Sequence, residues 1–99
     1  MKRLQIGHIR AGMCNMEVPG RLVEVGKPVQ MSTRYTLALL GKAKLRDDTG
    51  EIVLNLWREQ THVLKESDVV ITRNAFAREF SGVIELNIGL DGKIVPYDG

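Results

Sequence analysis

Apolar and polar residues alternate most clearly in the middle of the chain, over residues 52–57. One side of this stretch holds Ile52, Leu54 and Leu56, and the other holds Val53, Asn55 and Trp57. A period of two residues is typical of a half-buried strand, so we expect the first set to face a core. The only tryptophan then shares the outer face with a polar amide, although tryptophan is highly buried on average. Trp57 is therefore either packed beneath other elements or exposed for contacts.

The same pattern and its interruptions predict further strands. These strands cover approximately Met16 to Val25, Tyr35 to Arg46, Val69 to Ala77 and Val83 to Ile88. Loops are expected over Gly26 to Thr33 and over Ala77 to Gly82. Asp47 to Gly50 predict a hairpin turn, in which the glycine can take a positive φ. Gly89 to Gly92 predict a last turn before a short terminal segment, Lys93 to Val95.

Between the third and fourth strands, Glu59 to Lys65 lack alternation and suit a short helix. Three strands, a short helix and two more strands form the element order of the OB-fold, a five-stranded, partly open Greek-key barrel. We therefore predict an all-β protein in which residues 1–99 form one such domain. An SH3-like barrel is the main alternative, but it has no natural place for a helix at that point.

Composition is that of a soluble domain, with 43% hydrophobic and 26% charged residues. The apolar runs are shorter than the roughly 20 residues of a membrane helix, and the N-terminus lacks the apolar centre of a secretory signal. Cys14 is the only cysteine and has no CxxC or His/Cys cluster nearby, which favours a reducing compartment and disfavours structural zinc. We expect a cytoplasmic protein without a membrane partner, metal or cofactor.

The net charge of +2 is too small to identify a partner, so the distribution of charge is more informative. Lys42, Lys44 and Arg46 alternate with apolar residues, which places three cations on one face of an extended chain. A solvated strand face explains this alternation equally well. Further arginines stand near the aromatic residues in the sequence: Arg58, Arg73 and Arg78.

Three segments give the chain a resemblance to a known family. They are Ile9 to Val18, the motif DDTGEIVLNLW, and the stretch SDVVITRNAFAREFSGVIELNIG. In their order and spacing they resemble the archaeal-type single-stranded DNA-binding proteins and the small single-strand sensors of eukaryotes. Ser67 stands where the family usually has glycine. The chain also stops just beyond the barrel, before the long tail by which many relatives recruit other proteins.

The resemblance implies a protein that binds single-stranded DNA, or RNA, and protects it at the nucleoid during replication, recombination or repair, alongside protein partners in those processes. In the family three aromatic rings on the barrel face stack bases, and the matching positions are Trp57, Phe76 and Phe80. Candidates to track phosphates are Lys42, Lys44, Arg46, Arg58, Arg73 and Arg78, and weaker candidates for polar contacts are Arg34, Asn55 and Asn87. With about three phosphates neutralised, the salt slope for single strands would be about −2.

Other functions are also compatible with parts of the sequence. Asp48, Thr49 and Gly50 spell the catalytic triplet of retroviral-type aspartic proteases, but the aspartate lies in a charged hairpin where two carboxylates cannot share a proton in a shielded site. Asp47, Asp48 and Glu51 resemble turn solubilisers more than the ligands of a metal nuclease. An RNA-binding module, such as an anticodon-reading domain, and a protein-docking subunit of a replication complex remain the alternatives within the same barrel.

Overall fold

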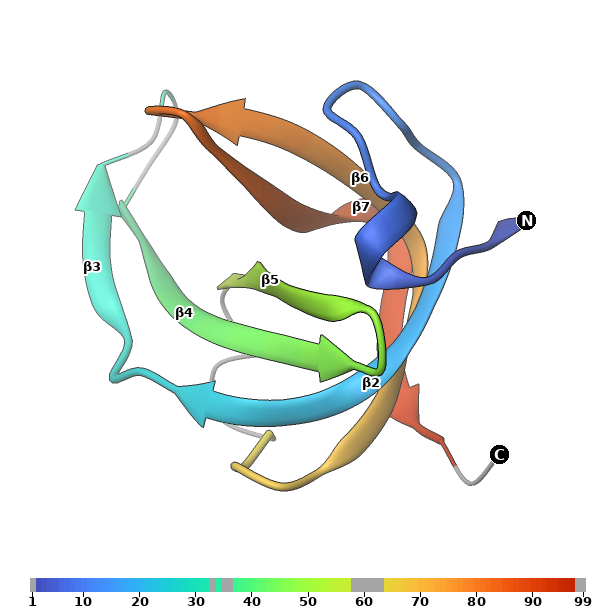
Figure 1. Ribbon diagram of the computed structural model, residues 1–99. Helices are drawn as coiled ribbons and strands as arrows, with labels where there is room; N and C mark the ends of the chain where they lie inside the picture. The colour runs from blue at the N-terminus through green and yellow to red at the C-terminus, as the bar shows by residue number, and fades with distance from the viewer. Residues whose placement is uncertain (1, 33, 35–36, 58–63, 98–99) are drawn as a thin grey trace.

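Strands make up most of the chain and form one curved sheet (Figure 1). This computed structural model describes residues 2–32, 34, 37–57 and 64–97, apart from the side chain of Leu90. Within these ranges the strands are β1 Lys2–Arg3, β2 Met16–Val25, β3 Val29–Ser32, β4 Leu37–Asp47, β5 Gly50–Trp57, β6 Val69–Phe80 and β7 Val83–Pro96. One turn of 3-10 helix, η1, covers Ile6–His8. No helix among the described residues is long and apolar enough to cross a membrane.

The sheet closes into a five-stranded barrel. Its strand order is β1-β2-β6-β7-β5-β4-β3, and a further pairing of β2 with β4 joins the two ends. The barrel wall is therefore β2, β6, β7, β5 and β4, while β1 and β3 are added at its edges. The pairing of β5 with β7 is parallel, and the β4–β5 and β6–β7 hairpins are antiparallel. This arrangement confirms the predicted all-β OB-fold.

The barrel interior is filled by the side chains that the alternating pattern assigned to it. Ile52, Leu54 and Leu56 of β5 are all buried, as predicted. They join one apolar cluster with residues of the other wall strands, among them Val18, Leu22, Ala43, Leu45, Val70, Ala75, Ala77 and Leu86. Because these strands are half-buried, the alternate residues face outward and form the surface described below.

Close contact between strands depends on glycine at two bends. A Cβ built at Gly20 of β2 would lie 2.8 Å from the Leu45 side chain and 2.9 Å from the Arg46 carbonyl oxygen, so β2 approaches β4 only without a side chain there. A Cβ at Gly92 of β7 would overlap the Ile88 side chain and lie 2.7 Å from the Arg73 carbonyl oxygen. Glycine in a strand interior commonly marks such a bend.

Two predicted loops are shorter than expected and one predicted turn is absent, because pairing with distant residues extends the strands. The segment Gly26 to Thr33 contains β3, which pairs with the first residues of β4. β6 runs on to Phe80, so the predicted loop Ala77 to Gly82 shrinks to a turn at Ser81 and Gly82. β7 continues to Pro96 through the predicted turn at Gly89 to Gly92, since its second half pairs with the first half of β6.

The helix predicted over Glu59 to Lys65 falls mostly on residues 58–63, which lie outside the described residues. Leu64 and Lys65 are described and are not helical. The helical turn that the structure does describe, η1, precedes β2 and packs against β5. Of its three residues, Ile6 alone is buried.

Candidate nucleic-acid interface

Four neighbouring strands, in the order β4, β5, β7 and β6, present one continuous outer face. Residues directly opposite each other in paired strands point to the same side of a sheet. The pairs that span this face are Leu40 with Trp57, Lys42 with Asn55, Val53 with Glu85, Asn87 with Phe76, Glu85 with Arg78, and Val83 with Phe80. The face thus carries cations on β4, aromatic rings on β5 and β6, and a polar centre on β5 and β7.

The three aromatic rings lie outside the buried core. Phe80, near the tip of the β6–β7 hairpin, is 69% exposed. Phe76 and Trp57 are half-buried, the first on β6 and the second at the end of β5. The Arg78 guanidinium carbon lies 5.1 Å from the centroid of the Phe76 ring, so this cation covers a ring face. The face therefore offers flat apolar surface beside a positive charge.

The three alternating cations of β4 are exposed on one face, as predicted, but each has a carboxylate partner. Lys42 Nζ lies 2.8 Å from Glu85 Oε2, and Lys44 Nζ lies 3.9 Å from Glu24 Oε2. Arg46 donates through Nε to Glu51 Oε2 at 2.7 Å. Most of the positive charge in this row (Lys42, Lys44 and Arg46, the cation row) is therefore balanced within the protein.

The remaining predicted cations are distributed differently. Arg73 precedes the β-bulge at Asn74 and lies 3.6 Å from Glu17 of β2, which also pairs with Arg3. Arg34 is exposed beyond β3. Arg58 lies outside the described residues. Of the predicted phosphate contacts, the structure thus brings Arg78 directly beside an aromatic ring and pairs four others with carboxylates.

Asn55 and Asn87 belong to a polar cluster with Lys42 and Glu85 at the centre of the face. Asn55 Nδ2 donates to Glu85 Oε1 at 2.9 Å and to Asn87 Oδ1 at 3.1 Å. Asn55 is 5% exposed, so little of this candidate for polar contacts is open on the face. Its Oδ1 is buried and has no hydrogen-bond partner among the described residues.

Glu85 was not a candidate from the sequence, although its outward position was predicted. Burial disfavours its charged form, but hydrogen bonds from Lys42 and Asn55 outweigh that effect and hold the pKa of Glu85 below its ordinary value. The residue is therefore ionised at neutral pH. Its partners are 43 and 30 positions away in the sequence, so no local signal identifies it.

The DDTG motif has a structural role that the sequence did not indicate. Asp47 Oδ2 accepts a hydrogen bond from the Ile6 backbone N–H at 2.8 Å, and Oδ1 accepts from the Thr49 N–H at 2.7 Å. Thr49 Oγ1 in turn accepts from the Gly7 N–H at 2.8 Å. These bonds join η1 to the β4–β5 hairpin. Desolvation opposes ionisation of Asp47, but these hydrogen bonds outweigh it and lower its pKa.

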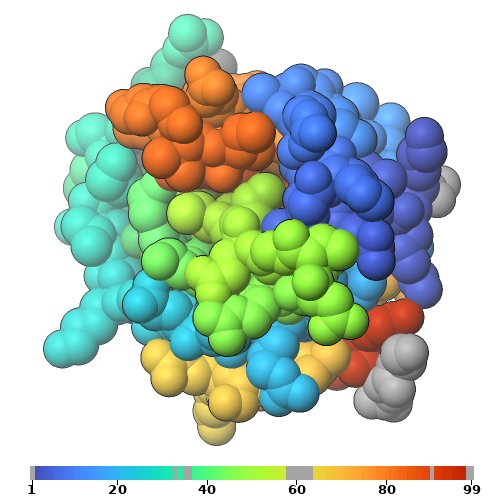
Figure 2. Space-filling view, viewed as in Figure 1, coloured from blue at the N-terminus to red at the C-terminus, as the bar shows by residue number. Residues whose placement is uncertain are grey.

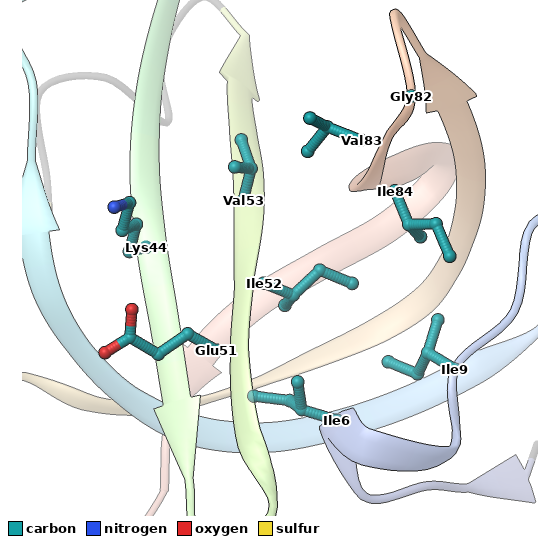
Figure 3. Close-up of a pocket in the computed structure, with 9 residues that line it drawn as sticks. All are labelled: Ile6, Ile9, Lys44, Glu51, Ile52, Val53, Gly82, Val83 and Ile84. Carbon is teal, nitrogen blue, oxygen red and sulfur yellow. The ribbon is translucent and has the colours of Figure 1, made fainter.

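A cleft of about 500 Å³ lies next to this face, where β5 and β7 share only a short parallel pairing. In Figure 3, four isoleucines from η1, β5, β7 and the segment after η1 line one side, and Lys44 and Glu51 lie across β5 from them. Figure 2 shows the green β4–β5 hairpin, the blue N-terminal segment and the orange β6–β7 hairpin meeting there. Isoleucine and valine side chains line the cleft together with Lys44 and Glu51, and no group of His, Cys, Asp or Glu among the described residues could hold a metal ion.

Comparison with known proteins identifies the family. A family model described as single-stranded DNA binding protein Ssb-like, OB fold, matches residues 19–96. The chain belongs to this family. It is 30% identical over 90 residues to the single-stranded DNA binding protein Ssb of Saccharolobus solfataricus, and the match covers 91% of the chain and 61% of that relative. The chain thus spans about three-fifths of the length of this Ssb protein.

Solved structures agree on the fold. The OB domain of Ta0387 from Thermoplasma acidophilum superposes with a TM-score of 0.86 at 21% identity, covering 100% of this chain and 90% of that one. The replication factor A related protein from Methanobacterium thermoautotrophicum gives a TM-score of 0.81 at 24% identity, with coverages of 98% and 92%. At such low identity these two structures support the Ssb-like chain's barrel and not its function.

Proposed function

We propose that this Ssb-like chain binds single-stranded DNA with little sequence preference, by stacking bases on Trp57, Phe76 and Phe80. The observation that carries the proposal is the exposure of Phe80, which is 69% open to solvent on the same outer face as the other two rings. A large apolar side chain gains by leaving water. Every base has a π-face, so such rings bind unpaired bases of any kind, contributing about 1–3 kcal/mol per base.

Duplex DNA hides the base faces inside its own stack, so these rings favour single strands by geometry. Arg78 supports this mode of binding, because its guanidinium lies next to the Phe76 ring and carries a charge that a phosphate can use. The cation row, together with Arg34, Arg58 and Arg73, supplies further positive charge along the path. Because most of that row is ion-paired, we assign the larger share of affinity to stacking.

We further propose that residues 1–99 act as one binding unit that protects exposed single strands in replication, recombination or repair. The membership of the Ssb-like family supports this role. Recruitment of other proteins in those processes is part of the proposal as well. Stacking does not distinguish ribose from deoxyribose, so RNA is a second ligand of the same face to be tested directly.

Titration of Trp57 fluorescence tests the proposal. Single-stranded oligonucleotides should quench the signal and duplex of the same sequence should not, because only unpaired bases reach the rings. Phe80→Ala should weaken binding by about tenfold, the equivalent of one stacked base. Phe80→Tyr retains a ring and serves as the matched control. Equal binding of duplex and single strand, or less than a twofold loss for Phe80→Ala, would contradict the proposal.

Competition of a labelled oligo-dT by oligo-dT and oligo-U of equal length decides between DNA and RNA. Similar competition by both would extend the ligand class to RNA, and weak competition by oligo-U would restrict it to DNA. A protein-docking subunit would give no fluorescence change with either oligonucleotide.

A further inference from the structure

A carboxylate lies at the centre of a face that is proposed to bind a polyanion. Glu85 of β7 stands between Val53 of β5 and Arg78 of β6 in the strand register. Its side chain is 13% exposed, so it forms part of the floor of the face and is still accessible from it. Its negative charge repels phosphates at this point. The centre of the face therefore suits the bases of a strand, with the backbone at the edges.

Hydrogen bonds hold Glu85 in one orientation. Its Oε2 accepts from Lys42 Nζ at 2.8 Å, and its Oε1 accepts from Asn55 Nδ2 at 2.9 Å. Turning the Asn55 amide around would direct its oxygen at two other acceptor oxygens, those of Glu85 and Asn87, so the observed orientation is the stable one. An ionised carboxylate offers about four lone-pair sites, and these bonds use two of them. Acceptor capacity remains for a ligand.

The surroundings of Glu85 are short of hydrogen-bond donors. Oδ1 of Asn55 is a second acceptor there, buried and without a partner among the residues described. The donor that reaches Glu85 from the open side is the Lys42 ammonium, which is 53% exposed and already engaged with it. A ligand that brings an N–H group to Glu85 would use the acceptor capacity that this carboxylate retains.

We propose that Glu85 reads the base next to the stacking rings, accepting a hydrogen bond from an exocyclic amino group and so favouring cytosine, adenine and guanine over thymine and uracil at one position. This inference rests on the proposed function, because the base must first be stacked on Trp57 or Phe76. Carboxylates accept hydrogen bonds from cytosine N4 in known protein–DNA contacts. Thymine and uracil place a carbonyl oxygen there instead, and its lone pairs face the carboxylate.

The preference concerns one base of the bound strand, and the other bases are bound without regard to sequence. One good base contact discriminates between bases by about 1–3 kcal/mol in nucleic-acid recognition. We expect the lower end of that range on an open face, which corresponds to roughly five- to tenfold in affinity.

The test compares oligo-dC with oligo-dU of equal length at one ionic strength, read by Trp57 fluorescence. These two oligomers have the same ring size and sugar. Cytosine carries a 4-amino group and an unprotonated N3, whereas uracil carries a 4-carbonyl and an N3–H. Wild-type protein should bind oligo-dC about five- to tenfold more tightly. Equal affinity for the two would overturn the inference and leave the proposed function intact. Failure to bind either oligomer would overturn both.

Variants assign the preference to Glu85. Glu85→Gln removes the carboxylate, releases Lys42 and adds an amide that can donate to O4, so the preference should vanish or turn toward oligo-dU. Glu79→Gln makes the same change in net charge on an exposed β6 residue opposite Ile84, off this face, and should keep the preference. Glu85→Asp retains a carboxylate and should still prefer oligo-dC over oligo-dU. This variant tests the role of the carboxylate even if Glu85→Gln folds poorly. A preference that survives in folded Glu85→Gln would overturn the assignment.

Discussion

The two strands at the flanks of the proposed interface, β4 and β6, both direct every second side chain onto it, yet these side chains have different surroundings. On β4 each member of the cation row has a carboxylate within 4 Å. On β6, Phe80 is largely exposed and Arg78 covers the Phe76 ring, with no carboxylate in salt-bridge distance among the described residues. Charge that looks available in the sequence is thus balanced in the fold, while the Phe80 ring remains exposed.

This difference indicates which physical term dominates binding. Exposed ion pairs are stabilised by only about 0–1 kcal/mol, so a phosphate can compete for their cations but gains little net attraction. A ring that leaves water and stacks on a base contributes about 1–3 kcal/mol. The face should therefore bind mainly through its rings, and the net charge of +2 agrees with a modest electrostatic contribution.

The aromatic residues of β6 should contribute more to single-strand affinity than the cation row of β4. Replacing Phe76 and Phe80 together by alanine should lower single-strand affinity by about a hundredfold, since each ring contributes about 1–3 kcal/mol. The matched control removes one ion pair of the other flank as a unit, Lys44→Gln with Glu24→Gln, and should cost at most about twofold. A larger loss in the control than in the aromatic variant, measured by the same fluorescence or anisotropy titration, would reverse the ranking.

A second prediction distinguishes the contribution of Asp47 to stability from any contribution to single-strand affinity. Asp47 ends that strand, and Asp47→Ala should lower the free energy of unfolding by about 1.5–3 kcal/mol, because hydrogen bonds from Ile6 and Thr49 to a charged group are lost. Single-strand affinity of the folded variant should stay within about twofold. Urea unfolding and the titration measure the two effects, and a large affinity loss with unchanged stability would assign Asp47 to the interface instead.

The lowered pKa of Asp47 adds a pH dependence to that prediction. A carboxyl whose pKa is lower in the folded state stabilises the fold above its unfolded pKa, about 3.9, and loses this contribution as pH falls through the folded value. Wild-type stability should therefore be retained from neutral pH to about pH 5 and decline below about pH 4. Asp47→Asn should show a weaker acid dependence than wild type over that range.

A third prediction concerns cations that are released from their partners. Glu51→Gln removes the carboxylate that holds Arg46 and should raise single-strand affinity by about twofold, the equivalent of about 0.5 kcal/mol for an exposed pair. Glu66→Gln, in the exposed turn before β6, makes the same change in net charge away from the face and should have a smaller effect. Unchanged or lower affinity for Glu51→Gln would show that the ion pair with Glu51 does not reduce the contribution of Arg46 to binding.

The smallest expected effect is in the salt dependence of the wild type. Three phosphate contacts would give a slope of about −2 for log K against log salt. Because all three members of the cation row are paired, we expect a shallower slope, between about −1 and −2. Affinity measured over a range of salt concentrations decides this, and a slope steeper than about −3 would show that charge is the main source of binding.

Much of the barrel was predictable because strand periodicity is a local property. The bounds of β2, the inward set of Ile52, Leu54 and Leu56, and the outward set of Val83, Glu85 and Asn87 all follow from residues one or two positions apart. The long β7 was not predictable in this way. Gly89 and Gly92 suggest a turn locally, and only pairing with β6 keeps the chain extended through them.

In the candidate site, too, some features follow from the local sequence pattern and others depend on long-range contacts. Alternation in the sequence is sufficient to place the aromatic and basic residues together on an outer face, because a period of two assigns every second side chain to one side of a strand. The contact of Lys42 with Glu85 and the burial of Asn55 between β4 and β7 depend on the assembled barrel. Those contacts join strands brought together by barrel closure, and their distances depend on register and curvature that no local pattern contains.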